Sequence, residues 1–149
     1  MKLFLNECGI VCALGDSLAE VSRRLFAGES GLAATTEWSP GRPIHLGRVS
    51  SPLPDGAGLA LQQRSRNNRL ALGALAQIRA AADAAVTRYG AHRVGVVLGT
   101  STSGSAETEA AMREFGASGA LPGQFHYAQQ EMGSAASMLA GVLGATGPT

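Results

Sequence analysis

The stretch Arg93-Val-Gly-Val-Val-Leu-Gly-Thr-Ser-Thr-Ser-Gly104 decides the fold class of this chain of 149 residues. Its first half is a short apolar run rich in valine, which is typical of a strand buried on both faces of a parallel sheet. The glycine and hydroxyl residues that follow predict a tight turn, and a helix is predicted over Ala106 to Phe115, with Ser103 or Ser105 as its N-cap. A buried strand, a glycine-rich turn and a helix form half of a βαβ unit, so we predict an α/β fold.

Two long helices flank this unit, as regular apolar spacing indicates. The longer runs from Ser65 to Tyr89 and ends at Gly90, and its apolar stripe is mostly alanine, so its neighbour must approach closely. The residues Leu59 to Arg64 predict a helical turn that leads into it. The other helix covers Gln129 to Leu143 and is capped by Gly144.

The first part of the chain predicts a strand followed by a short helix. The strand covers Met1 to Leu14, and Gly9 lies where a close approach or a bulge is expected. The helix starts with a capping box at Ser17, although Asp16 is a rival cap. Gly28 ends this helix as a left-handed residue.

Residues 30–54 lack any period, and their prolines and glycines predict an irregular segment. Within it only Ile44 to Val49 predicts a short edge strand. The predicted sheet has two or three strands, which cannot cover the apolar faces of the predicted helices. The sequence stops at Gly147-Pro-Thr149, where another strand would begin, so we expect an incomplete mixed sheet whose missing part lies outside this sequence.

The composition indicates a protein with a large interior or a normally covered surface, because 45% of the residues are hydrophobic and only 15% are charged. Twelve basic residues oppose eleven acidic ones, for a net charge of +1. Nucleic-acid binders usually carry a concentrated basic excess, so we expect no nucleic-acid partner.

The two cysteines, Cys8 and Cys12, form neither a disulfide framework nor a metal-binding spacing. We expect both to be buried small residues in a reducing compartment. The apolar run Leu3–Leu5 is too short for a signal peptide, and we expect no segment that spans a membrane. We therefore expect a cytoplasmic, soluble protein without a metal or cofactor.

The loop Gly99-Thr-Ser-Thr-Ser-Gly104 also invites comparison with phosphate-binding loops. It lacks the Lys-Ser/Thr pair that follows the last glycine in such loops. Glu107 and Glu109 would repel a phosphate at this position, so a tight strand-to-helix turn is the preferred interpretation.

Four segments, in order along the chain, resemble β-ketoacyl-acyl carrier protein synthases. Gly9-Ile-Val-Cys-Ala-Leu-Gly15 looks like the family's opening Gly-Ile-Val-Ser-Pro-Leu-Gly, and Leu25-Phe-Ala-Gly-Glu-Ser-Gly31 looks like its Leu-Leu-Ala-Gly-Lys-Ser-Gly. Val94 to Gly104 is similar to its first central strand and glycine loop. Gly144-Ala-Thr-Gly-Pro-Thr149 is similar to the Gly-Leu-x-Gly-Pro segment that introduces the nucleophile strand.

Two further segments look more like the synthases of aryl polyene pathways, namely Arg66-Asn-Asn-Arg-Leu-Ala-Leu72 and Phe125-His-Tyr-Ala-Gln-Gln-Glu131. The resemblance implies a thiolase-like layered αβαβα architecture, of which residues 1–149 are the N-terminal half, truncated before the nucleophile elbow. It also implies decarboxylative Claisen condensation of an acyl thioester with malonyl-acyl carrier protein. A cysteine suits that chemistry because a thiolate is both a strong nucleophile and a good leaving group.

The resemblance also implies that the catalytic residues lie beyond this sequence. Cys8 and Cys12 do not match the family's nucleophile, and His45, His92 and His126 do not match its catalytic histidines. We expect His45 and His92 to be solvated loop residues. Residues 1–149 should therefore be inactive alone.

Three residues match positions that bind the acyl chain in the family. Thr102 matches a pocket position that often holds a bulkier aliphatic residue, and its hydroxyl would leave room for a longer or more polar chain. A role in the turn alone is equally open. Phe125 and His126 match the segment that reaches toward the partner's acyl pocket, and an ordinary loop anchor is the alternative.

Three arginines, Arg64, Arg66 and Arg69, gather where the long helix begins, although the helix dipole does not favour positive charge there. In the family this helix start helps dock the acidic acyl carrier protein. A solvated basic turn is the alternative.

The resemblance leaves two classes of function open. One is a ketosynthase; the other is a chain-length-factor-like subunit, which shares the fold and shapes the tunnel without a nucleophile. A further thiolase-like synthase fits the segments less well. We expect a homodimer or a heterodimer of ketosynthase and chain length factor.

Overall fold

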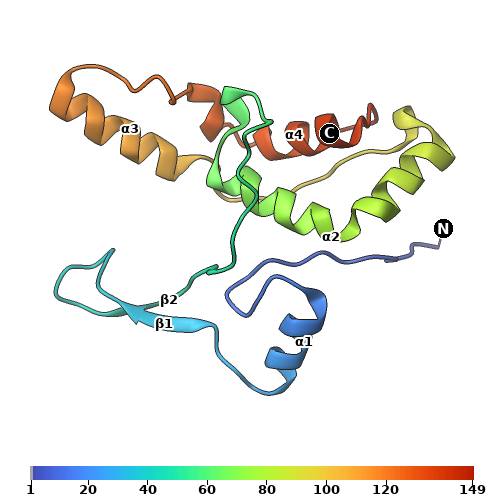
Figure 1. Cartoon of the computed structure of the whole chain (residues 1–149), viewed down its shortest axis with the longest axis horizontal. Coiled ribbons are helices and arrows are strands. Elements are labelled where there is room, and N and C mark those ends of the chain that lie inside the picture. The colour runs from blue at the N-terminus through green and yellow to red at the C-terminus, as the bar shows by residue number, and fades with distance from the viewer. Residues whose placement is uncertain (1) are drawn as a thin grey trace.

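A computed structural model describes residues 2–149 of the chain, which form two groups of elements (Figure 1). The helices are α1 (Leu18–Phe26), α2 (Arg66–Tyr89), α3 (Ser105–Ser118) and α4 (Ser134–Leu143), and the strands are β1 (Leu32–Thr35) and β2 (Ile44–Gly47). Single 3-10 turns are η1 (Leu61–Gln63), η2 (Ala91–Arg93) and η3 (Tyr127–Gln130). In Figure 1, α2, α3 and α4 form one group, while α1 and the hairpin of β1 and β2 form the other.

The core lies where α4 packs along α2. Ala135, Met138 and Ala140 of α4 are buried, and Leu75 is the buried apolar residue of α2. The long helix is confirmed at Arg66–Tyr89, between its N-cap Ser65 and Gly90.

The last helix begins five residues later than predicted, because residues 127–130 form η3 instead. Met132 is consequently outside α4 and 52% exposed rather than part of its buried stripe. Gly144 is the C-cap of α4, as predicted, and adopts the left-handed conformation.

The N-terminal strand prediction is wrong for the described residues. Residues 2–11 are extended but pair with no strand, and the bridge between Cys12 and Gly15 only closes a turn. Leu5 is fully exposed, and Cys8 is exposed rather than buried. A strand needs a neighbour for its ladder hydrogen bonds, and residues 2–149 supply none beside this segment.

Close packing at Gly9 is confirmed. A Cβ atom there would lie 2.1 Å from the carbonyl oxygen of Ala74, so the N-terminal segment crosses α2 backbone to backbone. The Gln77 side chain fastens the crossing: its Nε2 donates to the Ile10 carbonyl at 2.8 Å, and its Oε1 accepts from the Ile10 N–H at 3.2 Å.

The limits of α1 agree with the sequence. The Ser17 hydroxyl accepts a hydrogen bond from the Glu20 N–H at 3.3 Å, so Ser17 rather than Asp16 is the N-cap. Gly28 follows the helix with a φ of +73°, which is the expected left-handed residue.

The segment 30–54 is more regular than predicted. The expected edge strand exists as β2, and β1 pairs with it antiparallel, Leu32 opposite Gly47 and Thr35 opposite Ile44. β1 was missed because Ala33 and Ala34 give a weak strand signal. It is the only sheet among residues 2–149, so the described part contains no larger mixed sheet.

The apolar run at Val94 to Leu98 is extended but is not buried on both faces. Val97 is 96% exposed, whereas Val94, Val96 and Leu98 are half-buried. The Val94 carbonyl accepts from the Gly147 N–H, and the Val96 N–H donates to the Pro148 carbonyl. Successive bonds involve later residues of both segments, so the two segments run parallel. They pair only one edge of the Val94–Leu98 run.

One described helix, α2, is long and apolar enough to cross a bilayer by length and composition, with a hydropathy of 1.2. The sequence analysis expected no apolar segment that could span a bilayer, and α2 departs from that expectation in its length and composition. α2 packs along α4, but only 6% of its apolar stretch is buried within residues 2–149.

Candidate functional site

The glycine loop of residues 99–104 is clamped against the segment that precedes α4. The Ser103 hydroxyl is buried and donates to the Gln129 carbonyl at 3.2 Å. A Cβ atom on Gly104 would lie 2.2 Å from the same oxygen. Gly104, with a φ of +22°, is the N-cap of α3. The prediction that Ser103 or Ser105 caps this helix is therefore wrong.

Gln129 is the polar centre of the site, and only 2% of it is exposed. Its Nε2 donates to the carbonyls of Leu61, Arg64 and Gln124 over 3.0–3.2 Å. Its Oε1 accepts from the His126 N–H at 3.0 Å, in a capping box around η3. The buried side-chain amide of Gln129 therefore joins the segment just before α2 to residues 124–130, and the backbone carbonyl of Gln129 adds the glycine loop.

Glu107 makes a second connection between α3 and α2. Its Oε1 accepts a hydrogen bond from the Arg66 backbone N–H at 2.7 Å. Arg66 is the first residue of α2, so the carboxylate lies at the positive end of that helix dipole. Glu107 also belongs to the first turn of α3, so a single carboxylate serves two helix starts.

Thr102 lies at a shallow hollow of about 180 Å³ between the glycine loop and α2, called here the Thr102 hollow. Its walls include Arg66, Leu70 and Glu107. Thr102 is exposed, and the hydroxyl of Thr100 donates to its carbonyl at 2.5 Å, so the residue also serves the turn.

Phe125 lines a second hollow of about 230 Å³ against α3, called here the Phe125 hollow. Glu107, Ala111 and Arg64 also line it, so Glu107 stands between the two hollows. His126 is exposed and does not line the hollow; its Nδ1 accepts from the Ala128 N–H at 3.1 Å as the cap of η3.

Two of the three arginines have structural partners. Arg69 donates from Nε to the Pro54 carbonyl at 2.5 Å and from Nη2 to the Leu53 carbonyl. Arg64 donates from Nε to the Leu59 carbonyl at 2.8 Å. The guanidinium of Arg66 has no hydrogen-bond partner among residues 2–149, so it is the one available to an acidic partner.

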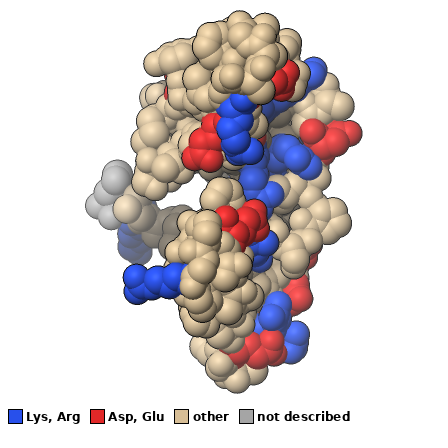
Figure 2. Space-filling view, turned by 90° about the vertical axis from the view of Figure 1, so that its left-hand side faces the viewer, with Lys and Arg blue, Asp and Glu red and all other residues tan. Residues whose placement is uncertain are grey.

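The charged side chains on the face that shows the end of α3 and the hairpin are mixed in sign. Figure 2 shows basic residues in a band across this face with acidic residues beside them. Any attraction for an acidic protein is therefore local to particular arginines rather than the field of the whole face.

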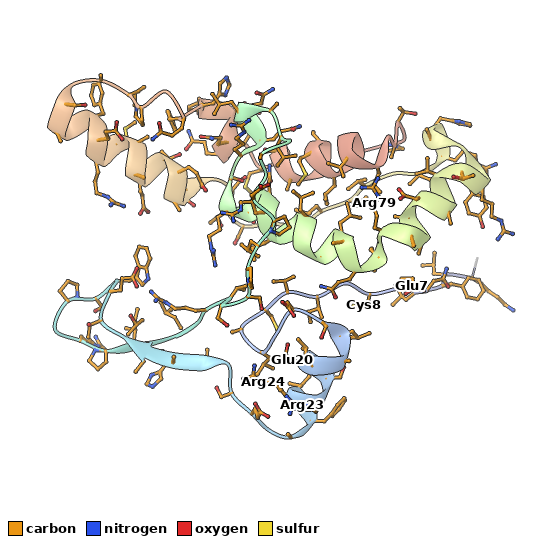
Figure 3. All side chains as sticks on the ribbon, viewed as in Figure 1. Glu7, Cys8, Glu20, Arg23, Arg24 and Arg79 are labelled. Atoms are coloured by element: carbon orange, nitrogen blue, oxygen red, sulfur yellow. The ribbon has the colours of Figure 1, made fainter. Side chains whose placement is uncertain are left out.

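A charge cluster on α1 is remote from both hollows. Figure 3 shows Glu20, Arg23 and Arg24 together on this helix. The Nε of Arg24 donates to Glu29 at 2.7 Å, which lowers the pKa of the Glu29 carboxyl and raises that of Arg24. Arg24 also donates to the Leu14 carbonyl at 2.5 Å, so the cluster fastens α1 to the preceding turn.

Neither cysteine is arranged as a nucleophile. Both are free thiols, Cys8 exposed and Cys12 half-buried, and neither has a histidine among its hydrogen-bond partners in the described part of the chain. His45 and His92 are exposed, as predicted, although His45 belongs to β2 rather than a loop. Residues 2–149 contain no group of three side chains that could hold a metal ion.

A solved structure of a ketosynthase (ApeO) in complex with its chain length factor (ApeC), from Xenorhabdus doucetiae, matches 97% of this chain. The TM-score is 0.87 and the sequence identity is 34%. The chain therefore has a ketosynthase-like fold and is similar in sequence to this ketosynthase–chain length factor complex. No protein-family model and no curated protein matches it.

The ketosynthase match confirms the predicted fold class, an α/β thiolase-like fold. The chain spans 37% of the length of the solved chain that it matches. The two-stranded sheet of β1 and β2 and the one-sided parallel contact of Val94 and Val96 lie in the chain that matches this ketosynthase-like fold.

The sequence singled out Thr102, Phe125 and Arg66, which the structure places along the two hollows, but it missed the residues that join them. Gln129 was assigned to a helix, and Glu107 was considered only as a first-turn residue of the helix after the glycine loop and as a charge that repels phosphate. The Gln129 signal was present in the His126-Tyr-Ala-Gln129 spacing, which fits a capping box with histidine as the cap. No local pattern indicates the bond between Glu107 and Arg66.

Proposed function

We propose that this chain is the N-terminal part of a β-ketoacyl-acyl carrier protein synthase of a fatty-acid, polyketide or aryl polyene pathway. The full protein would catalyse decarboxylative condensation of an acyl thioester with malonyl-acyl carrier protein. It would act in the cytoplasm as a homodimer or as a heterodimer with a chain length factor. No cofactor is required for this chemistry.

The observation that carries the proposal is the 34% identical match over 97% of the chain to a ketosynthase–chain length factor complex. The placement of the site residues supports it. Thr102 and Phe125 line neighbouring hollows on either side of Glu107, as expected for parts of one acyl-binding region. Arg66 lines the Thr102 hollow and has an available guanidinium, as expected beside a carrier-docking surface.

His126 has a smaller part in this proposal than Phe125. Its imidazole caps η3 and thereby holds Phe125 and Gln129 in place. Contact between His126 and an acyl chain would require the partner subunit to approach its exposed side.

The second candidate function is a chain-length-factor-like partner without a nucleophile. The specific observation in its favour is that the matching structure contains such a subunit beside the ketosynthase. The two functions differ in whether the full protein forms an acyl thioester with its own cysteine.

Intact-mass measurement of the full-length protein after incubation with an acyl carrier protein separates the two. A ketosynthase gains the mass of the acyl group on a thiol, and the gain disappears when its nucleophilic cysteine is replaced. A chain length factor gains nothing but changes the product length of its ketosynthase. Residues 1–149 alone should gain no acyl group, and an acyl adduct on Cys8 or Cys12 would contradict the proposal.

A further inference from the structure

The glycine loop with Thr102, the 124–130 segment with Phe125 and the start of α2 with Arg66 are joined in a closed path. The path consists of hydrogen bonds and the backbone between them. Gln129 connects the carbonyl of Arg64 with the 124–130 segment, and its own carbonyl accepts from Ser103 in the glycine loop. The path continues along the loop into α3 and returns to α2 through the bond from the Arg66 N–H to Glu107.

The two ends of this path differ in kind. The Gln129 end is buried and has four hydrogen bonds from its side chain, so it is a rigid joint. The Glu107 end is a single charge-assisted bond between half-buried Glu107 and exposed Arg66, across 41 residues. Removing that bond would open the path while the buried joint stays intact.

We infer that Glu107 is a positioning residue that couples the carrier-docking start of α2 to the acyl-binding glycine loop. Glu107 lines both the Thr102 hollow and the Phe125 hollow while it holds the backbone of Arg66. A shift of Arg66 toward a docked carrier therefore displaces the wall between the two hollows. This coupling deepens the proposed function and rests on it.

Substitution of Glu107 in the full-length protein tests the coupling, with Glu109 as a matched control. Glu109 is exposed on the same helix, and its side chain forms no hydrogen bond within residues 2–149. It lies two residues from Glu107, so it points to a different side of the helix. Glu107→Ala removes the acceptor, Glu107→Gln retains an acceptor oxygen without the charge, and Glu109→Ala makes the same truncation elsewhere.

The first measurement is hydrogen exchange without any carrier protein. Glu107→Ala should accelerate exchange of backbone amides both in the first turn of α2 and in residues 100–104, and Glu109→Ala should accelerate neither. Acceleration in α2 alone, or in neither segment, would overturn the inference. This result does not depend on the proposed function.

The second measurement is a double-mutant cycle on the Kd of an acyl-loaded carrier protein, with Arg66→Ala and Thr102→Val. In the wild-type background the two effects should deviate from additivity by about twofold or more, as connected residues do. Glu107→Ala should make them additive, while Glu107→Gln should keep most of the deviation.

The outcomes separate the two hypotheses. Salt-dependent carrier binding with an unchanged deviation in Glu107→Ala supports the proposed function and overturns the coupling. Absence of any carrier binding by the wild-type protein contradicts the proposed function, and the exchange result then decides the coupling by itself.

Discussion

The hydroxyl of Ser103 donates to the carbonyl of Gln129 over 3.2 Å, although 26 residues separate them in the chain. This contact presses the glycine loop against the segment before α4 and leaves no space for a side chain at Gly104. The loop is therefore shaped by packing against Gln129 as well as by its own turn.

Gly104→Ala is expected to destabilise the full-length protein by roughly 1–3 kcal/mol, because the new Cβ meets the Gln129 carbonyl in a strained backbone conformation. Denaturant unfolding measures the loss. Gly99→Ala is the matched control, since nothing lies within 4 Å of a Cβ there. Equal stability losses in the two variants would contradict the clamped loop.

Arg66→Glu should affect carrier binding, whereas Arg69→Glu should affect stability. Arg66→Glu should weaken carrier binding about tenfold, the loss of one charge-assisted contact, and leave stability nearly unchanged. Arg69→Glu should lower stability, because its guanidinium holds the carbonyls of Leu53 and Pro54. Carrier titration and thermal unfolding check the two expectations, and loss of stability in Arg66→Glu would show that its guanidinium has a structural partner.

Thr102→Phe is expected to shorten the acyl chains that the full-length protein or its complex accepts, because the larger ring fills the Thr102 hollow. Mass spectrometry of the products measures the profile. Ser101→Phe, one residue away and outside the lining of that hollow, should leave it unchanged. A profile that Thr102→Phe does not alter would restrict Thr102 to the turn.

The ion pair of Arg24 and Glu29 predicts a specific contribution to acid sensitivity. The folded state lowers the pKa of Glu29 below its ordinary value of 4.5, so the carboxylate form is stabilised by folding. This contribution to stability is fully present at pH values above the unfolded pKa of about 4.5. It is lost as the pH falls through the lower pKa of the folded state. An NMR titration of Glu29 should show this lower value in wild-type protein, and an ordinary value in Arg24→Ala; an ordinary value in both would contradict it.

The elements that the sequence predicted well are those defined by local chemistry. The helix of residues 66–89 and the caps Ser17, Gly28 and Gly144 follow from side chains that act within one turn of their own backbone. The predicted start of α4 was wrong because His126 and Gln129 form the capping box of a 3-10 turn. The apolar residues near this turn have the spacing of a helix.

The errors in the strands have a different physical origin. Val94 to Leu98 has the composition of a buried strand, but burial depends on neighbours, and within residues 2–149 only the segment at Thr146–Pro148 pairs with it. The two adjoining hollows and the bond of Glu107 to Arg66 required the folded chain. The roles that the resemblance implies for Thr102, Phe125 and Arg66 stay predictions.

The most direct test of the account is the mass of the carrier-bound product that the full-length protein forms, with and without its ketosynthase-type partner, from acyl and malonyl carrier proteins. We predict a 3-oxoacyl carrier extended by two carbons, or a change in the length of the partner's product. Neither a ketoacyl product nor any change in the partner's product would contradict a role in carrier-bound chain extension.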